Sequence, residues 1–424
     1  MLYLHERVMK NPLLSILASF VLASCSGSGG DSPESDLPVA FTSAVYGECG
    51  SGADIELPCG FPTPREEENN LLSMEKIELG RLLFYDRNMS FNQTQSCGDC
   101  HLPEKAFTDG LTVSVGSQGD MHARNAMSMT NVVYNSTMNW ANNQIINLEQ
   151  QALAVLLNEE PVELGWAGHE AEILGRLKMP SVADYAGTPF DTVAPDYPSM
   201  FANAFPDDTD KITIDTVNKA LAAFGSTMIS GDSEFDKDQR NEVNSMSDTA
   251  RNGRELFFSE RLECFHCHGG FNFSDSIDHA GVQFTQNSFH NNALYNLDGN
   301  GLYPSNNHGL REFTLLPEDE GKFRAPSLRN IELTAPYMHD GSIATLDEII
   351  DHYSQGGRLI SSGENAGDGS LNPNKSSFIN GFVITAGERL DLIEFFKSLT
   401  DWDFVCRDSL SDPFGNVQKH MMCP

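Results

Sequence analysis

Two distant segments of the chain carry apolar side chains at helical spacing and share a short sequence. Gly80-Arg81-Leu82-Leu83-Phe84 ends the first segment, and Gly253-Arg254-Glu255-Leu256-Phe257 ends the second. Ser73 precedes the first and Ser247 the second, and serine is a favoured N-cap residue. The pattern therefore predicts two similar helices, one in each half of the chain.

Two further segments, about 213–229 and 385–399, place apolar residues along one helical face. Each follows one of the first two helices after a long stretch that is rich in Gly, Asn and Pro and has little periodicity. Such stretches are predicted to be long loops. The sequence therefore predicts a mostly α fold built from two similar halves.

A cysteine–histidine motif lies between the two helices of each half: Cys97-Gly98-Asp99-Cys100-His101 and Cys264-Phe265-His266-Cys267-His268. Two thiols at this spacing can bond to both vinyl groups of a haem, and the adjacent imidazole then binds the iron. One such motif would also suit half of a zinc site or a redox pair, but two in duplicated surroundings favour haem. We predict two covalently bound haem c groups, attached through Cys97, Cys100, Cys264 and Cys267, with the irons bound by His101 and His268.

These motifs predict two cytochrome c-like haem domains in tandem, with long loops. The expected boundaries are 71–240 for the N-terminal domain and 241–405 for the C-terminal domain. A tether and N-terminal extension at 26–70 precede them, and a tail at 406–424 follows them.

The first 25 residues have the pattern of an exported lipoprotein. Arg7 and Lys10 precede an apolar stretch at 13–23, which is too short for a transmembrane helix. The stretch ends in Leu22-Ala23-Ser24-Cys25, which resembles a bacterial lipobox with Cys25 as the lipidated residue. A plain signal peptide cleaved nearby is the alternative. We expect a periplasmic protein that contacts a membrane only through a lipid anchor at Cys25.

The chain is strongly acidic, with 60 Asp and Glu against 27 Lys and Arg and a formal net charge of −33. A surface this negative repels phosphates, so nucleic acid is excluded as a partner. It attracts basic partners, such as some small cytochromes, although high charge also serves solubility alone.

Four cysteines lie outside the haem motifs and the lipobox: Cys49, Cys59, Cys406 and Cys423. An even number in an oxidising compartment predicts two disulfides near the chain ends. The spacing leaves their pairing open.

Other stretches resemble the bacterial di-haem cytochrome c peroxidases and MauG, the di-haem enzyme that oxidises tryptophans of a partner protein. The resemblance covers nearly the whole mature chain and includes Phe107-Thr108-Asp109-Gly110, Leu148-Glu149-Gln150-Gln151-Ala152, Arg324-Ala325-Pro326-Ser327-Leu328-Arg329-Asn330 and Thr334-Ala335-Pro336-Tyr337-Met338-His339-Asp340-Gly341. Pro161-Val162-Glu163-Leu164-Gly165 and Asn291-Asn292-Ala293-Leu294-Tyr295-Asn296-Leu297-Asp298-Gly299 are similar to one branch, the MbnH enzymes of methanobactin operons. That branch is associated with oxidising a tryptophan of a secreted copper-binding protein to kynurenine.

The resemblance implies that the haem on His101 reacts with hydrogen peroxide. Glu163 matches a distal glutamate that can move a proton between the two peroxide oxygens. Gln151 matches a distal glutamine that can hydrogen-bond the bound oxygen, and Trp140 matches a tryptophan that relays charge between the haems. Without the resemblance, each would be an ordinary loop or core residue.

The blocking histidine that many peroxidases have after the position of Gly116 is replaced by Ser117. His122 lies nearby and is an alternative distal ligand, or an ordinary loop histidine. Trp140 is followed by Ala141-Asn142-Asn143, where peroxidases usually have Asp-Gly-Arg, and three extra residues separate it from Glu163. These departures put simple peroxidase activity in doubt.

The second haem is expected to have Tyr353 as its distal ligand, where MauG has a tyrosine and the peroxidases have a methionine. A phenolate is a harder, anionic donor than a thioether and favours the higher oxidation states of iron. A core aromatic is the alternative role of Tyr353. The resemblance also implies one calcium ion, bound by the side chain of Asn125 and the carbonyls of Thr334 and Pro336.

Three functions follow from these residues. The first is a MauG-like enzyme, in which peroxide forms a high-valent di-haem state that oxidises a tryptophan of a secreted partner protein. The second is a peroxidase that reduces hydrogen peroxide with electrons from a small cytochrome, and the third is a non-enzymatic electron carrier. A tyrosine ligand and an open first haem favour the first.

Overall fold

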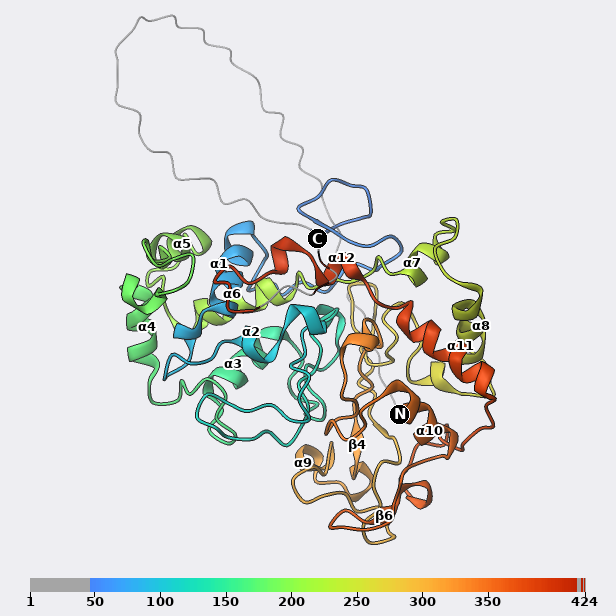
Figure 1. Ribbon diagram of the computed structural model, residues 1–424. Helices are drawn as coiled ribbons and strands as arrows, with labels where there is room; N and C mark the ends of the chain where they lie inside the picture. Colours follow the sequence, from blue (N-terminus) through green and yellow to red (C-terminus); the bar gives the residue numbers. More distant parts are fainter. Residues whose placement is uncertain (1–45, 418–420, 422, 424) are drawn as a thin grey trace, which may run out of the picture. The chain divides into compact units, whose positions relative to one another are not determined.

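The computed structural model describes residues 46–417, 421 and 423, and these residues are mostly helical (Figure 1). The first half contains α1 (Met74–Tyr85), α2 (Cys97–Cys100), α3 (Leu148–Leu157), α4 (Glu170–Lys178), α5 (Tyr197–Ala204) and α6 (Ile214–Gly225). The second half contains α7 (Glu234–Gln239), α8 (Asp248–Phe257), α9 (Arg311–Thr314), α10 (Leu346–Ser354), α11 (Ala386–Lys397) and α12 (Trp402–Val405). The mostly α prediction is confirmed.

Three pairs of two-residue strands are the β-structure of the described residues. They are β1 (Tyr46–Gly47) parallel to β2 (Ile55–Glu56), β3 (His290–Asn291) antiparallel to β4 (Lys322–Phe323), and β5 (Leu359–Ile360) antiparallel to β6 (Gly367–Asp368). Each pair fastens the ends of a loop and builds no layer of its own.

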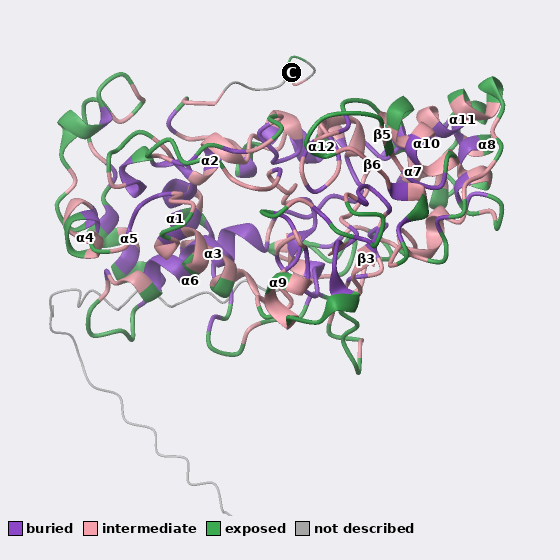
Figure 2. Cartoon of the chain, turned by 90° about the horizontal axis from the view of Figure 1, so that it is seen from below, coloured by how far each residue is buried: buried purple, intermediate pink, exposed green. Residues whose placement is uncertain are grey.

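The four helices that the periodicity predicts are present. Ser73 begins α1 by accepting a hydrogen bond from the Lys76 N–H at 3.2 Å, and Ser247 begins α8 by accepting one from the Ala250 N–H at 3.0 Å. Helix α1 packs on α6 and α8 packs on α11, so each half has one long helix pair (Figure 1). Burial concentrates where these helices meet (Figure 2).

A glycine at the same place in each shared sequence explains how the helices of a pair approach so closely. A Cβ on Gly80 would collide with the carbonyl oxygen of Ala220 in α6, and a Cβ on Gly253 would collide with that of Asp391 in α11. The sequence repeat therefore reports a repeated backbone contact between helices, which a larger residue would push apart.

The prediction of uninterrupted loops between the helix pairs was wrong for part of the chain. Helices α3, α4 and α5 lie in the first half and α10 in the second. Each has ten residues or fewer, and several are bounded by Pro or Gly. Short helices of this kind gain their stability mainly from tertiary packing, so their sequence signal is weak.

The segment after α11 returns to the first half of the chain. Phe404 of α12 packs on Phe107, with ring centroids 5.5 Å apart, and the Tyr85 hydroxyl donates to the Leu410 carbonyl at 2.6 Å. The C-terminal residues therefore complete the core beside the first haem motif, and the domain boundaries at 240 and 405 stay a prediction. The described residues of both halves belong to one compact unit.

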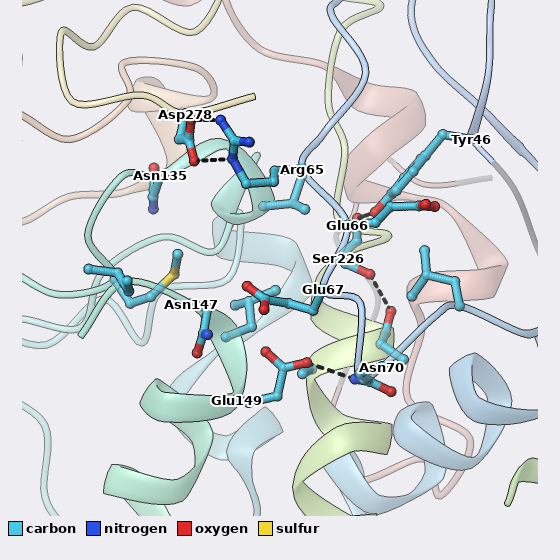
Figure 3. Close-up of a pocket in the computed structure, with 17 residues that line it drawn as sticks. Tyr46, Arg65, Glu66, Glu67, Asn70, Asn135, Asn147, Glu149, Ser226 and Asp278 are labelled. Atoms are coloured by element: carbon cyan, nitrogen blue, oxygen red, sulfur yellow. Dashed lines mark hydrogen bonds and ion pairs between the residues drawn. The ribbon is translucent and has the colours of Figure 1, made fainter. Parts of the chain in front are cut away.

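The N-terminal extension is fastened to both halves (Figure 3). Arg65 makes two hydrogen bonds to Asp278, at 2.7 and 2.9 Å, while the Tyr46 hydroxyl donates to the Ser226 carbonyl at 3.1 Å. These residues border a cavity of about 610 Å³ that contains none of the predicted haem or calcium residues.

The two predicted disulfides are present, and they join Cys49 to Cys59 and Cys406 to Cys423. Within the described ranges, no helix is long and apolar enough to cross a membrane. The expected lipid anchor at Cys25 and the signal peptide lie outside the described residues.

Candidate active site

The first haem motif forms a short helical turn, α2, that borders a cavity of about 2250 Å³. Asp99 closes the start of this turn by accepting from the backbone N–H and the hydroxyl of Ser96, at 2.8 and 3.0 Å. The thiols of Cys97 and Cys100 are free and line the cavity together with His101.

The second haem motif borders a separate cavity of about 1490 Å³. Cys264, Cys267 and His268 all line it, and both thiols are free. Most of the remaining lining is apolar and aromatic. Each motif therefore has a hollow of its own.

The two histidines are oriented in the same way. Nδ1 of His101 lies 2.8 Å from the Phe107 carbonyl oxygen, and Nδ1 of His268 lies 3.1 Å from the Phe273 carbonyl oxygen. A carbonyl only accepts, so Nδ1 carries the proton and Nε2 keeps its lone pair for a metal. Burial lowers the pKa of both imidazoles, which favours the neutral, ligating form. Paired thiols, a ligating imidazole and a hollow fit a haem c in each half.

Two of the predicted distal residues face the first cavity. Gln151 lies on α3, whose N-cap is Asn147, and its Oε1 is buried without a hydrogen-bond partner in the described part of the chain. The amide can be turned to present either its oxygen or its NH₂ group to a ligand in the cavity. Glu163 also lines this cavity, and burial raises the pKa of its carboxyl to about 7.

The loop that carries Ser117 packs against the loop that carries Glu163. The Ser117 N–H donates to the Glu163 carbonyl at 2.8 Å, and the Val162 N–H donates to Asp120 at 3.0 Å. Ser117 itself does not line the cavity, whereas His122 does. The structure therefore leaves His122 as the residue of this loop that could bind the first iron.

Tyr353, near the end of α10, lines the second cavity together with His268. Burial raises the pKa of its phenol well above the usual value, so loss of the proton there requires a compensating charge such as a metal. Met338 lines the same cavity, but its sulfur accepts a hydrogen bond from the Asn292 amide at 3.2 Å. Both side chains thus line the second cavity, and the resemblance to MauG favours Tyr353 as the ligand.

Trp140 and Asn125 line both cavities. The indole N–H of Trp140 donates to the Asn125 carbonyl at 2.8 Å, which fixes the ring between the two hollows. Thr334 and Pro336, the other predicted calcium ligands, line the second cavity beside Asn125. The three predicted calcium ligands therefore all line the second cavity, as Trp140 does.

Two residues of the second cavity had no predicted role. Arg324 and His339 are 3% and 2% exposed, and within the described residues the Arg324 Nη1 and both ring nitrogens of His339 have no hydrogen-bond partner. Burial lowers the pKa of Arg324 to about 10, so the guanidinium stays charged at neutral pH. The carboxylates of a haem would supply the missing acceptors. Both residues lie in the sequence stretches that carry the family resemblance, which was the available signal.

Known proteins are similar to this chain in sequence and fold. A family model of the di-haem cytochrome c peroxidases matches residues 74–244. The crystal structure of a MauG-like protein associated with microbial copper homeostasis is 44% identical, superposes with a TM-score of 0.79, and is matched over 84% of this chain and 98% of that chain. This chain belongs to the di-haem cytochrome c peroxidase and MauG superfamily.

More distant members match over most of their length. Cytochrome-c peroxidase IdrP1 of Denitromonas iodatirespirans is 28% identical over 388 residues, which cover 86% of this chain and 92% of that protein. The methylamine utilization protein MauG of Methylorubrum extorquens is 27% identical over 349 residues, covering 82% and 83%. Membership of this superfamily makes the chain a peroxidase-type oxidoreductase with two haem c groups.

Proposed function

We propose that this superfamily member is a MauG-type enzyme that uses hydrogen peroxide to oxidise a tryptophan of a partner protein, with kynurenine as the expected product. The observation that carries the proposal is that Tyr353 lines the same cavity as His268. The resemblance implies a methionine at this position in the peroxidases and a tyrosine in MauG. The similarity to a MauG-like protein associated with copper homeostasis supports the same branch.

The residues of the first cavity suit the reaction with peroxide. A haem held by Cys97, Cys100 and His101 would supply the iron at which peroxide is reduced. Because the pKa of Glu163 is about 7, Glu163 is a carboxylate in a large share of the protein molecules at neutral pH. In these molecules it can take a proton from peroxide. The resulting carboxylic acid can return the proton to the departing oxygen, and Gln151 can orient the bound group.

The residues between the cavities suit the distribution of oxidising equivalents over two haems. Trp140 borders both hollows and its N–H is held by a carbonyl, so the ring has a fixed orientation. A phenolate from Tyr353 would stabilise an electron-poor second iron. An oxidising equivalent would therefore pass between the haems through Trp140 and be held at the haem near Tyr353.

The surroundings of the reaction are also part of the proposal. A periplasmic chain anchored through Cys25 and carrying a net charge of −33 would meet secreted proteins and favour those with a basic face. Asn125, Thr334 and Pro336 would bind one calcium ion beside Trp140 and hold the two halves in register.

A di-haem peroxidase that takes electrons from a small cytochrome is the second candidate. His122 on the wall of the first cavity favours it, because a histidine ligand there would have to leave before peroxide could bind. The similarity to a cytochrome-c peroxidase over 92% of its length points the same way.

The absorption spectrum of the diferric protein, recorded after one equivalent of hydrogen peroxide without prior reduction, separates the two candidates. The proposal predicts an immediate and persistent change in both haems, with a new near-infrared band. A protein that does not react until one haem has been reduced, and then turns over with a reduced cytochrome, would establish the peroxidase instead. The Tyr353→Phe variant should lose the near-infrared band.

A further inference from the structure

Apart from Tyr353, which lines the second cavity, the tyrosines of the described residues fall into two groups according to what their hydroxyls donate to. Five donate to carbonyl or amide oxygens, which do not take up a proton: Tyr46 to the Ser226 carbonyl, Tyr85 to that of Leu410, Tyr134 to that of Pro62, Tyr337 to that of Ile331, and Tyr303 to the Asn291 side-chain amide oxygen. Three donate to carboxylates: Tyr185 and Tyr197 to Asp86, and Tyr295 to Asp340. Two phenols sharing one buried carboxylate is the unusual arrangement.

Asp86 follows α1 directly and is 1% exposed. One oxygen, Oδ1, accepts from the Asn88 N–H at 2.8 Å, which holds the carboxylate in place. The other, Oδ2, accepts from the Tyr185 hydroxyl at 3.0 Å and the Tyr197 hydroxyl at 2.7 Å. Tyr197 is completely buried and Tyr185 is 3% exposed, so solvent has little access to these contacts.

Both tyrosines of this cluster share a hydrophobic core with a residue that lines the first haem cavity. Phe84, two residues before Asp86, lines that cavity, and its ring centroid is 6.4 Å from that of His101. The ring of Tyr85 lies 4.9 Å from that of Phe84. Tyr197 begins α5, which packs on α1, so these side chains belong to one hydrophobic core.

A buried phenol can lose an electron at moderate cost only if its proton leaves at the same time, because a phenol radical cation in an apolar core is unstable. A carbonyl oxygen cannot keep that proton, whereas a carboxylate can. Burial raises the pKa of Asp86 and also those of Tyr185 and Tyr197, so the phenols are protonated beforehand and the carboxylate holds an added proton well.

We propose that Tyr185, Tyr197 and Asp86 form a proton-coupled redox site that accepts an oxidising equivalent from the first haem when no partner protein is bound. In this step one electron passes from a phenol to the peroxide-oxidised haem centre, which is thereby reduced by one equivalent. The phenolic O–H bond breaks and its proton moves to Oδ2 of Asp86. A neutral tyrosyl radical hydrogen-bonded to a carboxylic acid remains.

One carboxylate accepts one proton, so the site stores one equivalent, and the second phenol keeps its proton and its hydrogen bond. Such a site would spare Met, Trp and His side chains near the haem from oxidation. The inference rests on the proposed function, because that reaction supplies the oxidant.

Rapid-freeze electron paramagnetic resonance of the haem-loaded protein, after one equivalent of hydrogen peroxide without partner, tests the site. We expect a tyrosyl radical in the unchanged protein and its loss in the Tyr185→Phe, Tyr197→Phe double variant. We also expect its loss in Asp86→Asn, which keeps both phenols but removes the proton acceptor. The matched control is Tyr85→Phe, which should retain the signal because Tyr85 donates to a backbone carbonyl. Thermal melting of each variant confirms that it is folded.

A second control is Tyr295→Phe. Burial pushes the pKa of Asp340 up, but His339 and the hydrogen bonds from Tyr295 and Ser342 outweigh it and leave that pKa below its usual value. Asp340 is therefore a poorer proton acceptor, and the signal should survive in this variant.

A radical that persists in both the double variant and Asp86→Asn, or that disappears in either control, would overturn the assignment. Haem spectra that respond to peroxide with no tyrosyl signal in the unchanged protein would refute the redox site and leave the proposed function standing. Haem spectra that do not respond at all would refute the proposed function, and the redox site with it.

Discussion

The two halves of the chain position their haem motifs in the same way, but the other residues that line the two cavities differ. In each half a long helix with a glycine at the same place packs on a closing helix, through the contacts of Gly80 and Gly253. In each half the histidine of the motif is fixed through Nδ1 by a carbonyl. These shared features suit the attachment of a haem and the binding of its iron, and they follow directly from the duplicated sequence.

The opposite walls carry the difference in function. The larger first cavity presents a glutamate and a glutamine, side chains that can move protons and orient a small ligand. The second presents Tyr353 among apolar and aromatic side chains. In the proposed function, the residues of the first cavity would serve the reaction with peroxide and those of the second cavity would serve the holding of charge.

The largest expected effect comes from Glu163→Gln, which removes the proton-transfer group of the first cavity. We expect the rate constant for the reaction with peroxide to fall by about 10²–10⁴. In the unchanged protein this rate should rise with pH through about 7, because the pKa of Glu163 lies there and only the carboxylate can accept a proton. Stopped-flow measurement across that pH range should show the rise, and it should vanish in the variant.

Glu159→Gln is the matched control, since Glu159 lies a few residues away and is exposed. Its rate and pH profile should equal those of the unchanged protein. A Glu163→Gln variant that reacts at the normal rate would mean that the first cavity works without its carboxylate.

The next largest effect is expected at Tyr353, which lines the second cavity. Tyr353→Phe removes the expected anionic ligand, so the spectrum of the second haem should change and its reduction potential should rise by on the order of 0.1 V. Spectroelectrochemical titration measures both. Tyr337→Phe is the control, because Tyr337 lines the same cavity but donates to the Ile331 carbonyl. An unchanged spectrum in Tyr353→Phe would remove Tyr353 as a ligand and leave Met338 as the candidate.

Trp140→Phe tests whether oxidising equivalents pass between the two haems through Trp140. A phenyl ring is harder to oxidise than an indole, so the first haem should react with peroxide at the normal rate while the response of the second slows by about tenfold, or ~1.4 kcal/mol on the barrier. Time-resolved absorption separates the two responses. The control is Trp402→Phe, a change in α12 at a residue that lines neither cavity. In this variant the second haem should respond as fast as in the unchanged protein. Equal slowing in both variants would argue against a specific relay.

The helix pairs and haem motifs that the two halves share could be predicted from the sequence. The residues that distinguish the two cavities largely could not. Periodicity with a capping serine predicted α1 and α8. The spacing of the cysteines and histidine, repeated in similar surroundings, predicted the haem motifs, because these signals depend on neighbours in the sequence. Glu163 and Tyr353 came from the resemblance, since each acts only when a distant segment brings it to a motif. Their roles stay predictions.

What escaped prediction depends on packing across the chain. Arg324 and His339 are notable only because they are buried without partners, and burial arises from segments far apart in sequence. The return of the C-terminal residues to the first half, through Phe404 and Leu410, has no local signal at all. Short helices such as α3 and α10, which position Gln151 and Tyr353, were missed for the same reason.

The smallest expected effect tests the shared part of the comparison. Gly80→Ala and Gly253→Ala each place a methyl group against a carbonyl of the partner helix. Overpacking of this kind costs about 1–3 kcal/mol, and the better helix propensity of alanine offsets about 1 kcal/mol of it. Urea unfolding of the haem-loaded protein should therefore show a modest loss of stability, similar in the two variants.

Each half also offers its own control. A Cβ on Gly175 in α4 or on Gly387 in α11 would meet no atom within 4 Å, so alanine there should stabilise by about 0.4–1 kcal/mol. Opposite signs for the two kinds of glycine would show that the repeated contact, and not helix propensity, explains the repeated sequence. Loss of stability for Gly80→Ala alone would mean that the second helix pair can separate slightly, and that the two halves are less alike than their sequences.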